Sequence, residues 1–155
     1  LHFLEDKRKD AKGITTKKRV KAEGMEHEVL MKEEEFLVSC SPYKGSLIDS
    51  AMENDFMRIT LVNHTQTERV TLDYGLQFSC KEIGSELDLP GIAIAEIKYE
   101  NHLSGSVLHA AMRKFRIKPS RFSKYAIGMA LLNPGLKQNR FKSRVRKVNQ
   151  LNNGS

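Results

Sequence analysis

Hydrophobic and polar residues follow a two-residue repeat in several parts of this chain and a helical repeat in others. Residues 2–9 and 14–21 are two short, strongly basic segments, and the turn-like Asp10-Ala-Lys-Gly13 lies between them. Short strand-like segments joined by such a turn are typical of a β-hairpin. The pattern therefore predicts that the chain begins with a basic hairpin.

The next region changes to helix-forming residues. Residues 25–38 combine five glutamates with Met, Val, Leu and Phe, which predicts a helix with a solvated acidic face that ends before Pro42. Residues 47–52 are predicted to form a second short helix, with Ser46 as its cap.

The middle of the chain is rich in β-forming residues. Residues 57–63 and 68–74 are separated by a polar loop, so we expect them to pair as antiparallel strands. Residues 76–80 would extend the sheet. Residues 92–99, preceded by Pro90-Gly91, give the clearest single strand in the sequence.

Helical spacing returns after this strand. Residues 106–115 predict one helix, and residues 122–132 predict a second, capped by Ser120 or Ser123. Residues 137–147 hold six bases and no acid. This last segment fits a basic C-terminal helix as well as a contact with a membrane or with nucleic acid.

Charged residues in the strands recur two positions apart, so each group lies on one face. The groups are Glu5, Lys7 and Lys9; Lys17, Arg19 and Lys21; Arg69, Thr71 and Asp73; and Glu96 and Lys98. In the last two strands the other face is apolar, and we expect it to be dry; its residues are Val70, Leu72, Tyr74, Ala95, Ile97 and Tyr99. In the first two strands Asp6, Arg8 and Lys18 are also charged, which leaves open which face of the hairpin is solvated.

This pattern has two interpretations. One is a sheet with an ordinary solvated face and no function, in which Glu96 and Lys98 form an exposed ion pair. The other is a basic cavity, because like charges across a sheet are unfavourable unless a ligand neutralises them. Several Lys and Arg with one or two carboxylates suit a polyphosphate carrying Mg²⁺ or Mn²⁺.

Composition supports a globular protein with an anionic partner. The 155 residues are 39% hydrophobic and 29% charged, with 26 Lys and Arg against 19 Asp and Glu, so the net charge is +7. A positive balance favours phosphates, nucleic acid or acidic lipid. Aromatic residues are only 7% and include no Trp, which does not favour nucleic acid as the partner.

Cysteines and apolar segments add little chemistry. Cys40 and Cys80 have no CxxC spacing and are interpreted as buried free thiols. The longest apolar stretch, residues 125–132, is far shorter than a membrane span, so we expect a cytoplasmic protein that reaches a membrane only through a partner.

Five strings in series resemble the VTC domain, the polyphosphate polymerase domain of the vacuolar transporter chaperone complex and its bacterial relatives. They are Phe3-Leu-Glu-Asp-Lys-Arg-Lys9, Thr16-Lys-Lys-Arg19, Glu68-Arg-Val-Thr-Leu-Asp73, Ala95-Glu-Ile-Lys98 and Arg121-Phe-Ser-Lys-Tyr125. Asn139-Arg-Phe-Lys142 also resembles the end of bacterial members. Together the strings cover nearly the whole chain.

The resemblance implies an α+β fold with an antiparallel triphosphate tunnel and flanking helices. It implies phosphate ligands at Lys7, Lys17, Arg19, Arg69, Lys98, Arg121 and Lys124, with Arg69 and Lys98 acting in catalysis. Glu96 would be the ligand of Mn²⁺ or Mg²⁺, and Glu5 and Asp73 would be polar tunnel residues. His64 falls near a position where eukaryotic members carry arginine.

The chain also departs from the family pattern. The family's first strands, with alternating glutamates and an Arg-x-Arg pattern, are not found, and Leu1 falls just after them. We expect an N-terminally truncated domain over residues 1–149 and a tail over 150–155. Either upstream strands or self-association would complete the tunnel, and a tunnel without those strands should not be fully active.

The first functional hypothesis is a metal-dependent polyphosphate polymerase that transfers the γ-phosphoryl group of ATP to a polyphosphate chain. A triphosphate hydrolase with the same fold is the second. The third is an accessory protein that binds polyphosphate or another polyanion without catalysis, and a nucleic-acid binder is the fourth.

Overall fold

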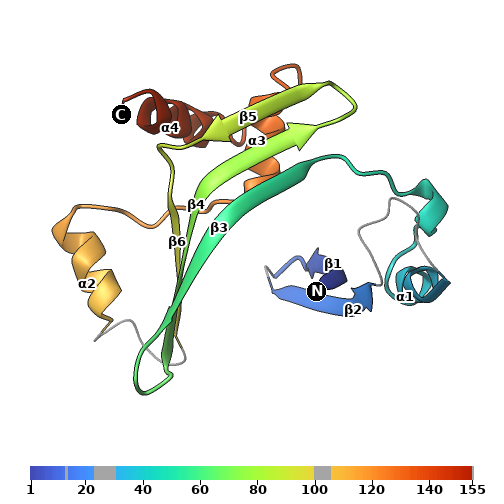
Figure 1. Cartoon of the computed structure of the whole chain (residues 1–155), viewed down its shortest axis with the longest axis horizontal. Coiled ribbons are helices and arrows are strands. Elements are labelled where there is room, and N and C mark those ends of the chain that lie inside the picture. Colours follow the sequence, from blue (N-terminus) through green and yellow to red (C-terminus); the bar gives the residue numbers. More distant parts are fainter. Residues whose placement is uncertain (13, 23–30, 100–105, 155) are drawn as a thin grey trace. The chain divides into compact units, whose positions relative to one another are not determined.

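The computed structural model describes residues 1–12, 14–22, 31–99 and 106–154, and it divides the chain into two compact units, Leu1–Ser50 and Ala51–Ser155 (Figure 1). Each unit has its own antiparallel sheet, with two strands in the first and four in the second. The predicted α+β class, with antiparallel strands and flanking helices, is confirmed. Over the described residues both sheets are open, as expected of an incomplete tunnel.

The first unit begins with the predicted hairpin. Strand β1 (His2–Lys9) pairs antiparallel with β2 (Thr15–Ala22), and the Asp10 carboxylate accepts a 2.7 Å hydrogen bond from the backbone N–H of Ile14 across the turn. Helix α1 (Met31–Cys40) confirms part of the predicted acidic helix and continues two residues beyond it. The start of that prediction, residues 25–30, lies outside the described residues.

The second helix predicted for residues 47–52 is wrong. The chain forms only a 3-10 turn, η1 (Gly45–Leu47), and Ile48 after it has the extended angles φ −112° and ψ 116°. Ser46 lies inside this turn, where it cannot cap a following helix. A β-branched residue such as Ile48 favours extended backbone, and the chain then enters the next strand within a few residues.

The sheet of the second unit is built around one long strand. Strand β4 (Glu68–Cys80) pairs with β3 (Glu53–Val62) along one edge. Along its other edge β4 pairs first with β6 (Ile94–Tyr99) and then with β5 (Ser85–Leu89). The predicted pairing and the extension through Cys80 are confirmed, and the strand predicted for residues 92–99 is confirmed from Ile94 to Tyr99, whereas β5 was not predicted.

A β-bulge at Gly75 changes which positions share a face along β4. Met57 pairs with Tyr74 and Asp55 with Gln77, so β4 has one residue more than β3 between these pairs. Gly75 has φ +61°, a conformation that glycine adopts without a Cβ penalty. As a result, odd-numbered residues of β4 before the bulge lie on the same face as even-numbered residues after it. Asp73 and Leu76, for example, share this face.

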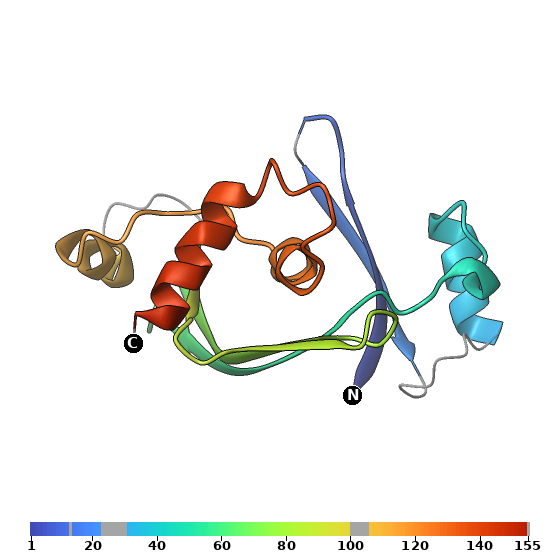
Figure 2. The same cartoon turned by 90° about the horizontal axis from the view of Figure 1, so that it is seen from above.

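Helices α3 (Lys124–Leu132) and α4 (Lys142–Asn153) cover that face, as Figure 2 shows. The core between helices and sheet contains Leu76, Phe78, Cys80, Leu89, Ile92, Ile127, Leu132 and Val148. The two cysteines, Cys40 and Cys80, are buried free thiols. Since α4 ends at Asn153, most of the segment predicted as a tail belongs to this helix.

The opposite face of the sheet was expected to be dry, and this is only partly correct. Val70 is buried, but Tyr74, Ala95 and Tyr99 are exposed. The reason is that α3 and α4 pack on the other face, whose apolar positions come after the bulge.

Helix α2 (Val107–Lys114) confirms the predicted helix over 106–115, with Ser106 as its cap: the Ser106 hydroxyl accepts a 3.0 Å bond from His109 N–H and donates a 2.6 Å bond to Glu68. Ser123 caps α3 in the same way, as one of the two predicted alternatives. No helix within the described residues is long and apolar enough to cross a membrane.

Candidate functional site: a cationic track on the sheet

The candidate site is a row of charged side chains on the face of the sheet that α3 covers. We call it the cationic track, and it consists of Arg58, Arg69, Asp73, Glu96, Lys98 and Lys124. The strand register places Arg58 opposite Asp73, Thr71 opposite Glu96, and Arg69 opposite Lys98. The register thus brings together on one face of the sheet the two groups that were each predicted to share a face of their own strand, Arg69 with Asp73 and Glu96 with Lys98.

The track is linear. Asp73 lies four positions after Arg69 along β4, which is about 14 Å at about 3.4 Å per residue. It carries four cations and two carboxylates, and its charges lie in successive rows rather than at one point. Such a row matches an elongated anion better than a single phosphate.

Asp73 organises one end of the track. Its side chain is 4% exposed and accepts bonds from Arg58 Nε at 2.6 Å, from Arg58 Nη2 at 2.8 Å and from Lys124 Nζ. Lys124, the first residue of α3, therefore reaches the sheet through this carboxylate. Asp73 fixes two cations that would otherwise repel each other.

Phe56 supports the same two cations. Its ring centroid lies 5.1 Å from the Arg58 guanidinium carbon and 4.1 Å from Lys124 Nζ, distances at which the ring face attracts a cation. Phe56 also packs against the core. The cluster thus joins the track to the hydrophobic interior.

Hydrogen bonding sets the electrostatics of this cluster. The bonds from Arg58, followed by those from Lys124, lower the pKa of Asp73 to about 2 from 3.8, against the opposing effect of burial. The bond to Asp73 also raises the pKa of Arg58, with a smaller contribution from the charge of Glu96. Asp73 is therefore ionised at neutral pH and is a structural anion.

Glu96 and Lys98 lie in the outer rows of the track. Glu96 Oε1 is 3.3 Å from Lys98 Nζ, and their side chains are 57% and 66% exposed. The exposed ion pair considered from the sequence is therefore present in this structure. Both side chains are open to solvent and can exchange this weak contact for a ligand.

Arg69 and Arg121 are exposed cations near the same strands and helix. Within the described part of the chain, neither is in an ion pair. Arg121 was predicted at the N-terminus of the second helix together with Lys124; it precedes the Ser123 cap by two residues, and only Lys124 is in the helix. His64 lies in the exposed loop that joins β3 to β4.

The predicted phosphate ligands of the first unit share one face of the β1–β2 hairpin. Lys7 is opposite Lys17, and Glu5 is opposite Arg19. Glu5 Oε1 lies 3.1 Å from Lys17 Nζ, and the Arg19 guanidinium lies 4.8 Å from the centroid of the Phe3 ring. These residues form a second basic group, in the unit Leu1–Ser50.

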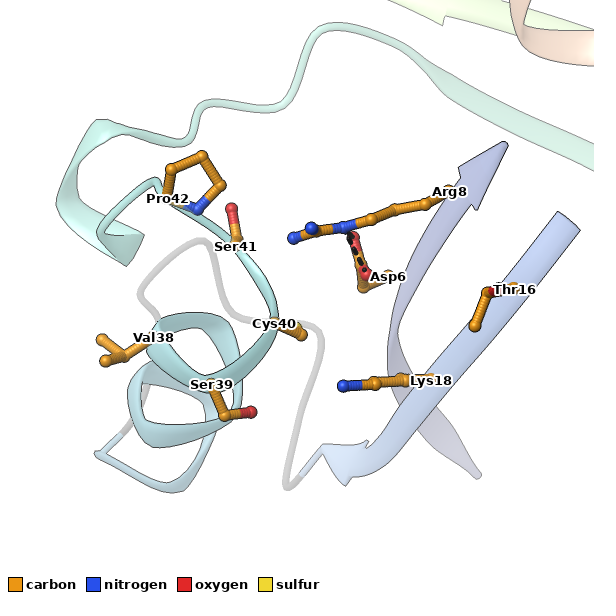
Figure 3. A pocket seen from close by; sticks show the side chains of 9 residues that line it. All are labelled: Asp6, Arg8, Thr16, Lys18, Val38, Ser39, Cys40, Ser41 and Pro42. Carbon is orange, nitrogen blue, oxygen red and sulfur yellow. Dashed lines mark hydrogen bonds and ion pairs between the residues drawn. The ribbon is translucent and has the colours of Figure 1, made fainter. Parts of the chain in front are cut away.

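The other face of the hairpin, which the sequence left undecided, faces α1. A cavity of about 320 Å³ lies there, lined by Asp6, Arg8, Thr16, Lys18, the end of α1 from Val38 to Cys40, and the following Ser41 and Pro42 (Figure 3). Arg8 Nε is 3.1 Å from Asp6 Oδ2. Because α1 covers this face, the more open face is the one with Lys7, Lys17 and Arg19.

Metal binding can be tested against the donor atoms present. Over the described residues there is no group of three or more His, Cys, Asp or Glu side chains that could hold a metal ion. Asp73 is engaged by two cations, so Glu96 is the carboxylate of the track that faces solvent. One carboxylate fits Mg²⁺ or Mn²⁺ that arrives with phosphate oxygens as its main ligands, but not a preformed metal site.

Arg58 is the member of the track that sequence reasoning missed. The available signal was its position in the strand. Arg58 and Thr60 lie on the same face of β3, and the pairing of β3 with β4 places them beside Asp73 and Thr71. The parity of single strands does not reveal this, because it depends on the register between two strands.

Comparison with known proteins shows a family for this chain. The family model described as the VTC domain matches residues 1–133, which include every predicted site residue. Searches of the curated proteins and of the solved structures found no match. The match covers most of the chain and is the family suggested by the five sequence strings.

Proposed function

We infer, since this chain belongs to the VTC domain family, that it binds polyphosphate along the cationic track and takes part in phosphoryl transfer from ATP to a polyphosphate chain. The observation that carries this proposal is the track itself: four cations and two carboxylates in successive rows on one face. An extended phosphate chain can meet such rows one after another.

The residues of this chain would act by holding and neutralising phosphates. Arg69 and Lys98 lie opposite each other and would bind phosphate oxygens from two neighbouring strands. Lys124 and Arg58, held by Asp73, would attract the phosphates at the other end of the track without changing position. Fixed cations are suited to phosphoryl transfer, where catalysis is mostly positioning and stabilisation of charge.

Glu96 would hold Mn²⁺ or Mg²⁺ together with phosphate oxygens. A bound divalent ion would supply charge neutralisation and alignment of the transferred group. Glu96 pairs with Lys98, and this pairing would keep the two side chains on the track until substrate separates them.

A non-catalytic role in polyphosphate binding is the second candidate. The makeup of the track favours it, because its four cations are enough to bind a polyanion, whereas Glu96 is the one carboxylate of the track that faces solvent and could hold a metal ion. Both candidates predict polyphosphate binding and differ only in turnover.

The test is phosphoryl transfer from γ-labelled ATP in the intact protein across a Mn²⁺ titration. Label in polyphosphate supports the polymerase, label in orthophosphate alone indicates hydrolysis, and no transfer with retained polyphosphate binding supports the non-catalytic role. Glu96→Gln should abolish metal-dependent transfer while polyphosphate binding without metal holds or strengthens, because a negative charge leaves an anion site.

Glu86→Gln is the matched control. Glu86 is an exposed acid of the same sheet and lies on the opposite face, across from Ser79. It should leave transfer and its metal dependence unchanged. An unaltered Mn²⁺ response in Glu96→Gln would remove Glu96 from the proposed metal site.

A further inference from the structure

The C-terminal part of the chain has an extreme charge imbalance. Residues 101–155 contain twelve Lys and Arg and no Asp or Glu, whereas residues 1–100 contain fourteen bases against nineteen acids. Of those twelve cations, Lys124 alone is in an ion pair within the described residues. The protein therefore concentrates its net positive charge in the helical part of the second unit.

Half of these cations lie on or just before α4. They are Lys137, Arg140, Lys142, Arg144, Arg146 and Lys147. Lys142, Arg146 and Lys147 are exposed, while Val145 and Val148 of the same helix pack into the core. We call Lys142, Arg146 and Lys147 the outer face of α4.

The outer face is held in a fixed position. Besides the two valines, the Asn152 side chain accepts a 3.2 Å bond from the backbone N–H of Gly91 next to β5. In the loop before α4, Gln138 donates a 2.7 Å bond to the carbonyl of Ala130 in α3. The backbone that carries these cations is therefore already ordered before a ligand binds.

The charges on α4 are placed where they oppose helix stability. The first turn holds no acidic residue, and no side chain caps the helix, so Lys142 and Arg144 lie against the positive end of the helix dipole. Lys142 and Arg146 are also four residues apart, a spacing at which like charges repel. A bound anion would relieve both unfavourable terms.

The outer face offers charge but nothing to insert into a membrane or stack on a base. The apolar side chains Val145 and Val148 are turned into the core, and Leu151 is the one long apolar side chain exposed on α4. α4 contains no aromatic residue. Membrane-surface helices need a free apolar face, and single-stranded nucleic acid is bound through aromatic stacking.

We propose that the outer face of α4 is a second binding surface for polyphosphate, one that holds the part of a long chain lying beyond the cationic track. This rests on the proposed function, because the track must bind the same polymer. The two surfaces belong to neighbouring elements: α4 packs against α3, whose first residue, Lys124, is a member of the track. Short phosphate chains fill the track alone, and long chains reach both.

The experiment compares two variants of the intact chain that each remove two exposed positive charges. Arg146→Gln/Lys147→Gln removes them from α4, and Arg113→Gln/Lys114→Gln removes them from the last turn of α2. Affinities for tripolyphosphate and for long-chain polyphosphate are measured by calorimetry at several salt concentrations, and binding to phosphatidylserine vesicles is measured by co-sedimentation. Thermal unfolding is recorded for each protein.

The α4 variant should lose about fivefold in affinity for the long chain, as expected for two exposed charge contacts, and keep its affinity for tripolyphosphate. A plot of the logarithm of its long-chain binding constant against the logarithm of the salt concentration should have a slope that is smaller in magnitude by about 1.4. Each lost phosphate contact is expected to reduce this slope by about 0.7. Its melting temperature should be unchanged or higher. The α2 variant measures the effect of net charge alone, and it should lose clearly less affinity for long-chain polyphosphate than the α4 variant does.

Three results would overturn this proposal. Equal losses in the two variants would mean that only net charge matters. If the α4 variant lost as much affinity for tripolyphosphate as for long-chain polyphosphate, the α4 residues would belong to the track. Retained polyphosphate affinity with lost binding to phosphatidylserine vesicles would identify a membrane surface instead. Failure of the proposed function would look different, since the parent chain would then not bind tripolyphosphate at all.

Discussion

Replacing Asp73 by Asn tests how the cationic track is held together. The substitution keeps the shape of a nearly buried side chain and removes the charge that binds Arg58 and Lys124. The pKa of Asp73 is lowered from 3.8 to about 2 by these partners, which corresponds to about 2 kcal/mol of unfolding free energy. Because the Arg58 side chain is 44% exposed and stays hydrated, we expect a loss near this value rather than the larger cost of a fully buried charge.

The sign of the pH dependence follows from the direction of the shift. A carboxyl whose pKa is lower in the folded state contributes its full stability above 3.8 and loses it as the pH falls through about 2. The difference between the parent and Asp73→Asn should thus be constant from pH 7 to about 4 and shrink towards zero near pH 2.

The assay is urea unfolding, monitored through the amide hydrogen exchange of β4. The signal then comes from the unit Ala51–Ser155. Asp55→Asn, an exposed acid on the other face of the sheet, is the control and should change stability by less than about 0.5 kcal/mol. Tripolyphosphate should bind Asp73→Asn at least as tightly as the parent and restore part of its stability. A loss below about 0.5 kcal/mol, or a difference that persists at pH 2, would refute the argument.

Three further substitutions test other parts of the structure. Lys98→Ala should weaken polyphosphate binding and leave the melting temperature nearly unchanged, because its ion pair is exposed; a loss as large as that of a core truncation would make Lys98 structural. Gly75→Ala should lower stability by about 1 kcal/mol from its φ of +61° alone, since an added Cβ meets nothing within 4 Å; unchanged thermal unfolding would contradict the bulge. Gly128→Ala should cost about 1–3 kcal/mol, because its Cβ would lie 2.6 Å from Phe78 and 2.7 Å from Met52; an unchanged urea midpoint would contradict this packing.

The alternation of side chains allowed much of the track to be predicted. Arg69 and Asp73 were placed on one face of their strand, and Glu96 and Lys98 on one face of theirs, because strand parity is a local property of the backbone. Arg58 was missed because its position depends on the register of β3 against β4. Strand β5, Ser-Glu-Leu-Asp-Leu, has a two-residue repeat that would have identified it.

Features that depend on distant contacts were harder to predict. The face with Tyr74 and Tyr99 looked dry from its sequence, yet helices from the end of the chain cover the other face, after the bulge at Gly75. A glycine inside a strand pattern was the available signal. The false helix at residues 47–52 shows the weakness of helix prediction over so short a segment, where few residues compete with the extended preference of Ile48.

The central claim is that the rows of the track bind a chain of phosphates rather than a single one. Calorimetry of the intact protein with tripolyphosphate and with orthophosphate, at one fixed salt concentration, tests it most directly. We predict clearly tighter binding of tripolyphosphate, and a smaller preference in Arg69→Ala, which removes one cation from the outermost row. Equal affinity for the two ligands in the parent protein would contradict the account.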